Sequence, residues 1–131
     1  MGKRPRIEEK KVEMFVGSAH GDLDAVRQLL EGQPALVNAA WDWGDGDWET
    51  ALGAAAHMGR KDIAEYLISR GARMDLFAAA MLGNTAIVKG ILDAFPEVRN
   101  APGPHGIPLL AHAKAGGSGS EEVVRLLEGE G

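Results

Sequence analysis

The sequence predicts an all-α solenoid of stacked helix-turn-helix units, and three observations lead to this fold class. First, "AHGDLDAVRQLLEGQPALVNA" at 19–39 and "MLGNTAIVKGILDAFPEVRNA" at 81–101 match at a constant offset, which indicates an internal repeat. Second, the segment 50–72 and a degraded copy from 107 onward each contain an Ala-rich stretch that is followed by a similar run of apolar residues. Third, apolar residues in that second run recur at i, i+1, i+4 and i+5, as in helices. One unit has too little core, so four units stack to supply it.

Each unit is predicted to begin with a short Ala-rich helix, turn at a glycine and continue into a second helix. The four pairs of helices are expected at 12–20 and 23–31, 50–58 and 61–70, 75–82 and 85–94, and 108–115 and 121–128. Small residues such as Gly17, Ala55 and Ala79 allow consecutive first helices to approach closely. The predicted organisation is a basic tail or helix start at 1–11 and one domain at 12–131, with units at about 12–38, 39–72, 73–100 and 101–131.

The second unit carries the most informative pattern. Its segment "ETALGAAAHMGRKDIAEYLISRGA" resembles the ankyrin repeat, roughly G-x-T-P-L-H-x-A-A-x-x-G-x-x-x-I-V-x-x-L-L-x-x-G-A. The positions that match are Thr50, Leu52, Ala55, Ala56, Gly59, Ile63, Leu67, Gly71 and Ala72. The resemblance covers about residues 12–128, with divergent outer units. It implies a small, stand-alone ankyrin repeat protein of about four repeats, whose hairpin tips and first-helix edges form a concave binding face.

Two departures from the repeat pattern fall on the connections between units. Gly83 follows Gly59 by only 24 residues, against a usual period of about 33, which predicts that the hairpin between the second and third units is missing. Asn38 and Thr50 are 12 residues apart, whereas the equivalent Asn100 and Pro108 are 8 apart. The hairpin between the first and second units is therefore predicted to be extended, by the stretch "WDWGDGDWE".

Composition limits the classes of function. The chain of 131 residues is long enough for one domain, is 45% hydrophobic and 25% charged, and carries a formal net charge of −5, which argues against a nucleic-acid binder. It has no Cys, so thiolate chemistry and disulfides are excluded. No apolar run is long enough for a membrane span or a signal peptide. We expect a cytoplasmic protein, most simply a monomer, that uses no cofactor and touches neither membrane nor nucleic acid.

The extended hairpin and the first-helix ends beside it form the candidate binding face. Trp side chains supply large contact areas at interfaces, and Met adapts to irregular partners. The candidate contact residues on this face are Trp41, Trp43, Trp48, His20, His57, Met58, Met81 and Leu82. An equally weighted alternative is that the three indoles fold onto the gap left by the missing hairpin and form a private mini-core.

The acids of the same stretch admit a metal interpretation and a turn interpretation. Asp42, Asp45, Asp47 and Glu49 do not have the spacing of a calcium loop, whereas Asp and Gly favour tight reversals and helix starts. We therefore predict no metal site, a turn, and a helix cap from Glu49 or Thr50. The charges of Asp42, Asp45 and Asp47 add to the candidate binding face and favour a basic partner.

The sequence leaves two hypotheses about function. The first is a non-catalytic interaction module that binds a protein or peptide segment, basic and apolar in character, on the concave face. The second is a small-molecule-binding protein or small enzyme with a Trp-walled pocket, in which His57 pairs with Asp45 or Asp47 for acid–base chemistry. No zinc or nucleophile motif is present among the four histidines and the serines, so enzyme activity remains the less favoured hypothesis.

Overall fold

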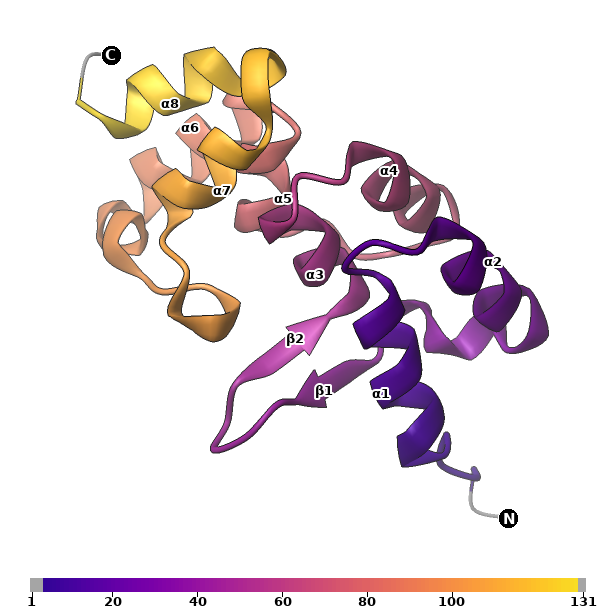
Figure 1. The fold of residues 1–131 in the computed structure, drawn as a ribbon. Coiled ribbons are helices and arrows are strands. Elements are labelled where there is room, and N and C mark those ends of the chain that lie inside the picture. The colour runs from indigo at the N-terminus through magenta and orange to yellow at the C-terminus, as the bar shows by residue number, and fades with distance from the viewer. Residues whose placement is uncertain (1–3, 130–131) are drawn as a thin grey trace.

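The computed structural model describes residues 4–129, and in them eight α-helices form four consecutive pairs (Figure 1). The first helices of the pairs are α1 (Glu9–Ser18), α3 (Ala51–His57), α5 (Leu76–Met81) and α7 (Leu109–Ala115). The second helices are α2 (Leu23–Gly32), α4 (Lys61–Ser69), α6 (Thr85–Ala94) and α8 (Glu121–Leu127). The chain is thus mostly helical, and each predicted helix is present within a few residues of its expected bounds.

Four of the helices, α2, α3, α5 and α6, begin where a short polar side chain caps them. The side chain of Asp22 accepts a hydrogen bond from the Ala25 backbone N–H at the start of α2, and Asn84 does the same for Ile87 at the equivalent position of α6. Thr50 caps α3 through Gly53, which decides the prediction in favour of Thr50 over Glu49. Such caps satisfy backbone N–H groups that have no partner inside the helix.

Glycine turns allow the pairs to stack closely. Gly83, between α5 and α6, has a φ of 75°, a backbone conformation that glycine adopts without strain. A Cβ at this position would collide with the backbone oxygen of Gly119. The first helices contact each other in series, α1 with α3, α3 with α5 and α5 with α7, and the second helices form the outer layer (Figure 1).

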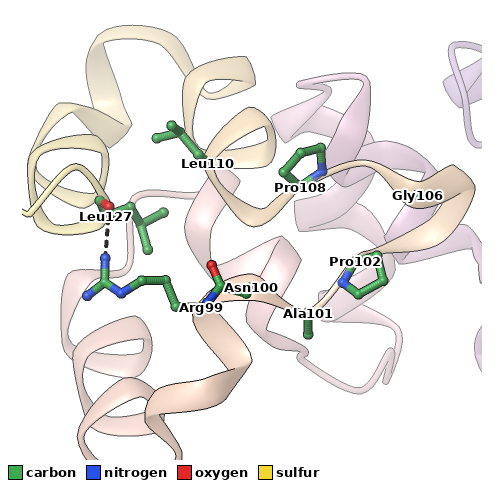
Figure 2. A pocket seen from close by; sticks show the side chains of 8 residues that line it. All are labelled: Arg99, Asn100, Ala101, Pro102, Gly106, Pro108, Leu110 and Leu127. Carbon is green, nitrogen blue, oxygen red and sulfur yellow. Dashed lines mark hydrogen bonds between the residues drawn. The ribbon is translucent and has the colours of Figure 1, made fainter.

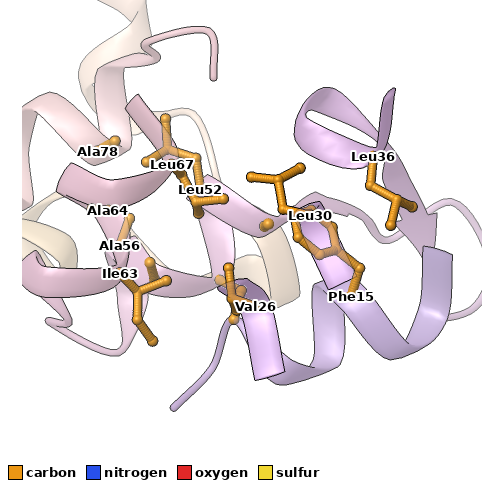
Figure 3. Packing of buried hydrophobic residues seen from close by; sticks show 14 of the residues in the cluster. Phe15, Val26, Leu30, Leu36, Leu52, Ala56, Ile63, Ala64, Leu67 and Ala78 are labelled. Atoms are coloured by element: carbon orange, nitrogen blue, oxygen red, sulfur yellow. The ribbon is translucent and has the colours of Figure 1, made fainter. Parts of the chain in front are cut away.

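The apolar core lies between the two layers of helices. Phe15 from α1, Leu30 from α2 and Leu52 from α3 are at most 2% exposed and pack in one cluster (Figure 3). A second cluster, which includes Val88 and Leu109, continues the core through the last two pairs. Small buried alanines in α3, α5 and α7 keep the neighbouring backbones close, as the sequence predicted.

One connection contains a β-hairpin. After a 3₁₀ turn, Pro34–Asn38, the strands β1 (Ala40–Asp42) and β2 (Trp48–Thr50) pair antiparallel, with Trp41 opposite Glu49. The link from α4 to α5 has no strand among its described residues. Two further 3₁₀ turns, Pro96–Asn100 and Pro104–Gly106, lead into α7, and a fourth, Gly117–Ser120, precedes α8.

Two details at the ends of the chain differ from expectation or lie outside the description. Helix α1 starts at Glu9, inside the segment 1–11 that was predicted as a basic tail or helix start. The Ser120 hydroxyl, at the start of α8, does not cap the helix but donates to the backbone oxygens of Ala113 and Gly117. Residues 1–3 and 130–131, at the outer limits of the predicted tail and domain, lie outside the described residues. No helix of residues 4–129 is long and apolar enough to cross a membrane.

Candidate functional site

A buried carboxylate at the base of the hairpin organises the candidate site. Glu49, in the middle of β2, is 1% exposed, although carboxylates are almost never fully buried without partners. Oε1 of Glu49 lies 3.2 Å from Nε2 of His20, and Oε2 lies 3.0 Å from Nε2 of His57 and 3.2 Å from Nε2 of His105. Three imidazoles therefore converge on one carboxylate. We call these four residues, His20, Glu49, His57 and His105, the histidine–glutamate cluster.

The four residues of the cluster come from separate parts of the chain. His20 follows α1, His57 is the last residue of α3, and His105 lies in the 3₁₀ turn before α7. Stacking brings His20 and His57 together, with ring centroids 5.0 Å apart, because both lie near the ends of neighbouring first helices. His105 reaches them from the last unit, with its ring centroid 5.2 Å from that of His57.

Neighbouring groups fix the outer nitrogens of two of the rings. Nδ1 of His20 lies 3.1 Å from the backbone oxygens of Val16 and Gly17, and Nδ1 of His105 lies 2.7 Å from Oδ2 of Asp47. Since a carbonyl or carboxylate oxygen can only accept, both Nδ1 atoms carry the hydrogen. Both rings consequently direct Nε2 at Glu49, and in the neutral rings this nitrogen holds a free lone pair.

Asp47 fastens the hairpin to the last unit. Its Oδ1 accepts a 2.7 Å hydrogen bond from the backbone N–H of His105, in addition to the contact between Oδ2 and the ring. His105 has a φ of 61°, which is uncommon for a residue other than glycine. This double contact therefore holds the strained turn and its imidazole in place beside Glu49.

Trp43 closes the cluster on the hairpin side. Its indole N–H donates a 2.8 Å hydrogen bond to Oε1 of Glu49, and its ring packs over Gly17 of α1. The indole ring also meets the rings of His20 and His105, with centroids 6.0 Å and 6.2 Å away. Trp43 thus shields the carboxylate, while the partly exposed rings of His20 and His105 keep a route to solvent.

The environment keeps both carboxylates of the site ionised. Burial acts most strongly on Glu49 and would raise its pKa, but the nearby His57 ring, the Trp43 hydrogen bond and the charges of His20 and His105 together hold the pKa below its usual value. The backbone hydrogen bond from His105 is the main cause of a lowered pKa at Asp47. Desolvation would lower the pKa of His105, yet Glu49 and Asp47 raise it above its usual value.

Two atoms inside the cluster lack hydrogen bonds. Oε2 of Glu49 and Nε2 of His57 are buried and close together, but neither has an aligned hydrogen-bond partner among the described residues. A buried polar group without a partner costs about 1–3 kcal/mol. An arrangement of three imidazoles and a carboxylate can take up a proton or coordinate a divalent metal ion.

A fourth histidine lies next to the cluster but is built differently. His112 in α7 is fully buried, its Nδ1 donates to the Pro108 backbone oxygen at 2.9 Å, and its ring packs on Phe77 with centroids 4.8 Å apart. Burial lowers the pKa of His112. This histidine is a neutral core residue.

The three tryptophans of the predicted binding face have different environments. Trp43 covers the histidine–glutamate cluster and is 38% exposed. Trp41 is half-buried in a groove between the hairpin and residues before and within α1, which include Ile7 and Val12. Trp48 lines the same groove but is 61% exposed. The indoles therefore form neither a single mini-core nor a single open surface.

The acids of the hairpin also divide into separate roles. Asp42 accepts hydrogen bonds from the backbone N–H groups of Gly44 and Gly46, and Asp45 adopts a φ of 53° at the exposed tip. These two acids shape the turn, as their residue types predicted. The enzyme hypothesis assigned Asp45 or Asp47 to His57, but the carboxylate in contact with His57 is Glu49, because Asp47 is held by His105.

The predicted contact residues at the ends of the first helices expose less apolar surface than expected. Met58 is 50% exposed beside His57, and Leu82 is half-buried. Met81 is fully buried in the core, so the prediction that it contacts a partner is wrong for this conformation. Its position faces the neighbouring first helix, where the close helix stacking removes it from solvent.

Sequence analysis missed the association of Glu49 and His105 with His20 and His57. Glu49 was considered as a helix cap, and no contact was predicted for His105. The usable signal was that His20 and His57 each lie within two residues of a turn glycine, Gly21 and Gly59, which places two imidazoles near adjacent helix ends. The contribution of the last unit depends on a loop path that spacing does not encode.

A separate pocket lies at the other end of the molecule. Arg99, Asn100, Pro108, Leu110 and Leu127 are among the residues that line this cavity of about 340 Å³ (Figure 2). The Arg99 side chain donates hydrogen bonds to the backbone oxygens of Leu126 and Leu127. Arg99, the one charged residue among the described residues that line the pocket, therefore ties α8 to the 3₁₀ turn Pro96–Asn100. These lining residues contain no acid–base pair.

The comparisons with known proteins agree with this architecture. The family described as ankyrin repeats (3 copies) matches residues 14–100. The chain is also 32% identical, over 110 residues, to the probable E3 ubiquitin-protein ligase XBOS31 of rice, Oryza sativa subsp. japonica. That match covers 77% of this chain and 24% of the rice protein, so the chain spans about a quarter of that relative's length. The chain belongs to the ankyrin repeat family, whose members are generally protein–protein interaction modules.

Proposed function

We propose that this ankyrin repeat protein is a non-catalytic interaction module, acting as a monomer, whose β1–β2 hairpin binds a segment of a partner protein. In this proposal the hairpin is the family's finger in extended form, and the finger between the second and third units is missing. The observation that carries the proposal is the exposure of Trp48, a large aromatic side chain that is 61% exposed beside a groove. Exposed Trp is typical of interface hot spots.

The groove and the charges around it favour a partner segment with apolar and basic residues. Trp41, Trp48, Ile7 and Val12 supply apolar walls. Asp42 is paired across the two strands with Trp48, and Asp45 projects at the exposed tip. No Lys or Arg occurs from 28 to 59, so Asp42 and Asp45 have no basic neighbour within the hairpin, and Arg6 is the one basic residue among the described residues that line the groove. A basic side chain beside an apolar anchor would complement this surface.

The test is selection from a peptide library displayed on phage, followed by affinity measurement with purified protein. We expect selected peptides to combine an aromatic or aliphatic residue with Lys or Arg, and Trp48→Ala to weaken their binding at least about tenfold. Phe95→Ala is the matched control, because Phe95 is 62% exposed but lies after α6, away from the hairpin. Equal affinities of the Trp48→Ala and Phe95→Ala proteins would overturn the proposal.

A further inference from the structure

The histidine–glutamate cluster presents its ligand atoms as a metal site does. One atom from each of His20, Glu49, His57 and His105 lies within 4.8 Å of all the others. Tetrahedral ligands at about 2.0–2.1 Å from zinc are about 3.4 Å apart. Oε2 of Glu49 lies 3.0 Å from Nε2 of His57 and 3.2 Å from Nε2 of His105, already close to this value. Nε2 of His20 is 3.2 Å from the other carboxylate oxygen, Oε1, so its distance to Oε2 and the separations between imidazoles have to adjust.

The groups behind the ligands are those that support metal-binding histidines. Metal-bound imidazole usually donates its other N–H to a backbone oxygen or a carboxylate. His20 donates to the backbone oxygens of α1, and His105 donates to Asp47. The Trp43 N–H orients Glu49 in the same way. These contacts fix three of the four ligands in the orientation that coordination needs.

The alternative, in which protons alone hold the cluster together, leads to crowded charge. His20 and His105 already donate through Nδ1, so a second donation through Nε2 makes each ring an imidazolium. Two such cations would have ring centroids 6.1 Å apart, and the ring of His57 would lie between 5.0 and 5.2 Å from both. One divalent ion instead leaves every ring neutral, and its charge balances Glu49 and Asp47. It also gives the unpartnered Glu49 Oε2 and His57 Nε2 a partner.

We propose that His20, Glu49, His57 and His105 bind one Zn²⁺ ion, which clamps the hairpin and the first two units to the loop of the last unit. Three imidazoles and one carboxylate suit zinc, whereas calcium and magnesium prefer oxygen ligands. Trp48 takes no part in this site, so the zinc proposal does not depend on the proposed partner.

The test begins with tag-free protein treated with EDTA, into which Zn²⁺ is titrated by calorimetry. We expect one equivalent to bind and the thermal midpoint to rise, because a ligand that binds only the folded state stabilises it. Co²⁺ used as a probe should show the intense visible absorption of a tetrahedral site. Ca²⁺ and Mg²⁺ should compete poorly. Absence of stoichiometric Zn²⁺ binding overturns the proposal.

A matched pair of variants separates the cluster from general attraction to the acidic hairpin. His105→Asn removes a ligand, and Asp45→Asn removes a nearby charge outside the cluster. Both residues have positive φ, 61° and 53°, which Asn tolerates, and circular dichroism checks that both variants fold. We expect His105→Asn to weaken Zn²⁺ binding at least about tenfold, as metal-site variants typically do, and Asp45→Asn to leave it unchanged. Equal affinities of the two variants would overturn the proposal.

A positioning variant provides a second line of evidence should His105→Asn affect the fold of the loop. Asp47→Asn keeps the size of the side chain but replaces the charged acceptor of the His105 ring N–H by a neutral amide, which weakens this hydrogen bond. Loss of such a supporting group usually costs about 10–100-fold in metal affinity. We expect a decrease in that range, with the Co²⁺ spectrum of the bound form retained. Unchanged affinity in Asp47→Asn, together with unchanged affinity in Glu49→Gln, would refute the assignment of ligands.

Discussion

The apolar core between the helix layers and the Glu49 carboxylate of the histidine–glutamate cluster are both shielded from solvent, yet they are surrounded by opposite kinds of side chain. The core packs Phe15, Leu30, Leu52 and Leu67 with small alanines. The cluster places one buried carboxylate among three imidazoles. The stability of the core depends on the shape and volume of its side chains, whereas the cluster depends on the distances between individual carboxylate oxygens and imidazole nitrogens.

The two regions also differ in how they depend on the chain. Core residues recur in every unit, so the repeat itself assembles the core. The cluster draws on His20 and His57 near the ends of neighbouring first helices, on the hairpin β1–β2, and on the loop around His105. A repeat scaffold can therefore carry an individual site where its connections deviate from the repeat.

The largest effect should come from the core. Leu67→Ala removes a fully buried side chain and should lower the free energy of unfolding by about 2–5 kcal/mol, measured by urea denaturation. Zinc affinity of the folded fraction should not change, because Leu67 has no contact with the cluster. A loss below about 1 kcal/mol would show that the core adapts to the cavity.

A smaller loss should follow a change at the centre of the cluster. Glu49→Gln, studied in the presence of EDTA, removes the charged acceptor of the Trp43 hydrogen bond and should cost about 1.5–3 kcal/mol. Trp43→Phe is the companion variant, because it removes the donor and keeps the carboxylate. If Glu49→Gln were instead more stable than the wild type without metal, the buried carboxylate would be a source of strain that zinc relieves.

The pH dependence of stability should distinguish His112 from the cluster. Burial lowers the pKa of His112 from its ordinary value of 6.5, so the unfolded chain takes up this proton first as the pH falls. The stabilising contribution of neutral His112 is complete above pH 6.5 and is lost as the pH falls toward the folded-state pKa. Urea denaturation above and below pH 6.5 should show a smaller decrease for His112→Asn than for the wild type. Equal decreases would assign the acid sensitivity to other groups.

The smallest effect should come from an exposed ion pair. Lys89 and Asp93 are four residues apart on α6, with Nζ and Oδ2 2.8 Å from each other, and both are mostly exposed. Such pairs contribute about 0.3–0.5 kcal/mol, so Lys89→Ala should change the free energy of unfolding by no more than that. A loss as large as that of Glu49→Gln would contradict the contrast between buried and exposed charges.

The fold was largely predictable because its signals are local and repeated. Gly21, Gly59 and Gly83 each precede a second helix, and the apolar spacing after them gave helix bounds within a few residues of those observed. The turn role of Asp42 and the cap at Thr50 also follow from residue type and position. The exposure of single residues was less predictable, as the buried Met81 shows, because it depends on how closely neighbouring helices approach.

By itself, the sequence determined that four helix pairs stack and where each turn between them lies, and it predicted an extended hairpin between the first two units. These features follow from periodicity and from the preferences of glycine and short polar residues, which act over a few positions. Only the tertiary structure decided that Glu49, Asp47 and Trp43 of the hairpin meet His105 of the last unit and the paired His20 and His57. The physical reason is that contacts between residues far apart in the chain depend on the paths of two loops, and the repeat pattern does not specify those paths.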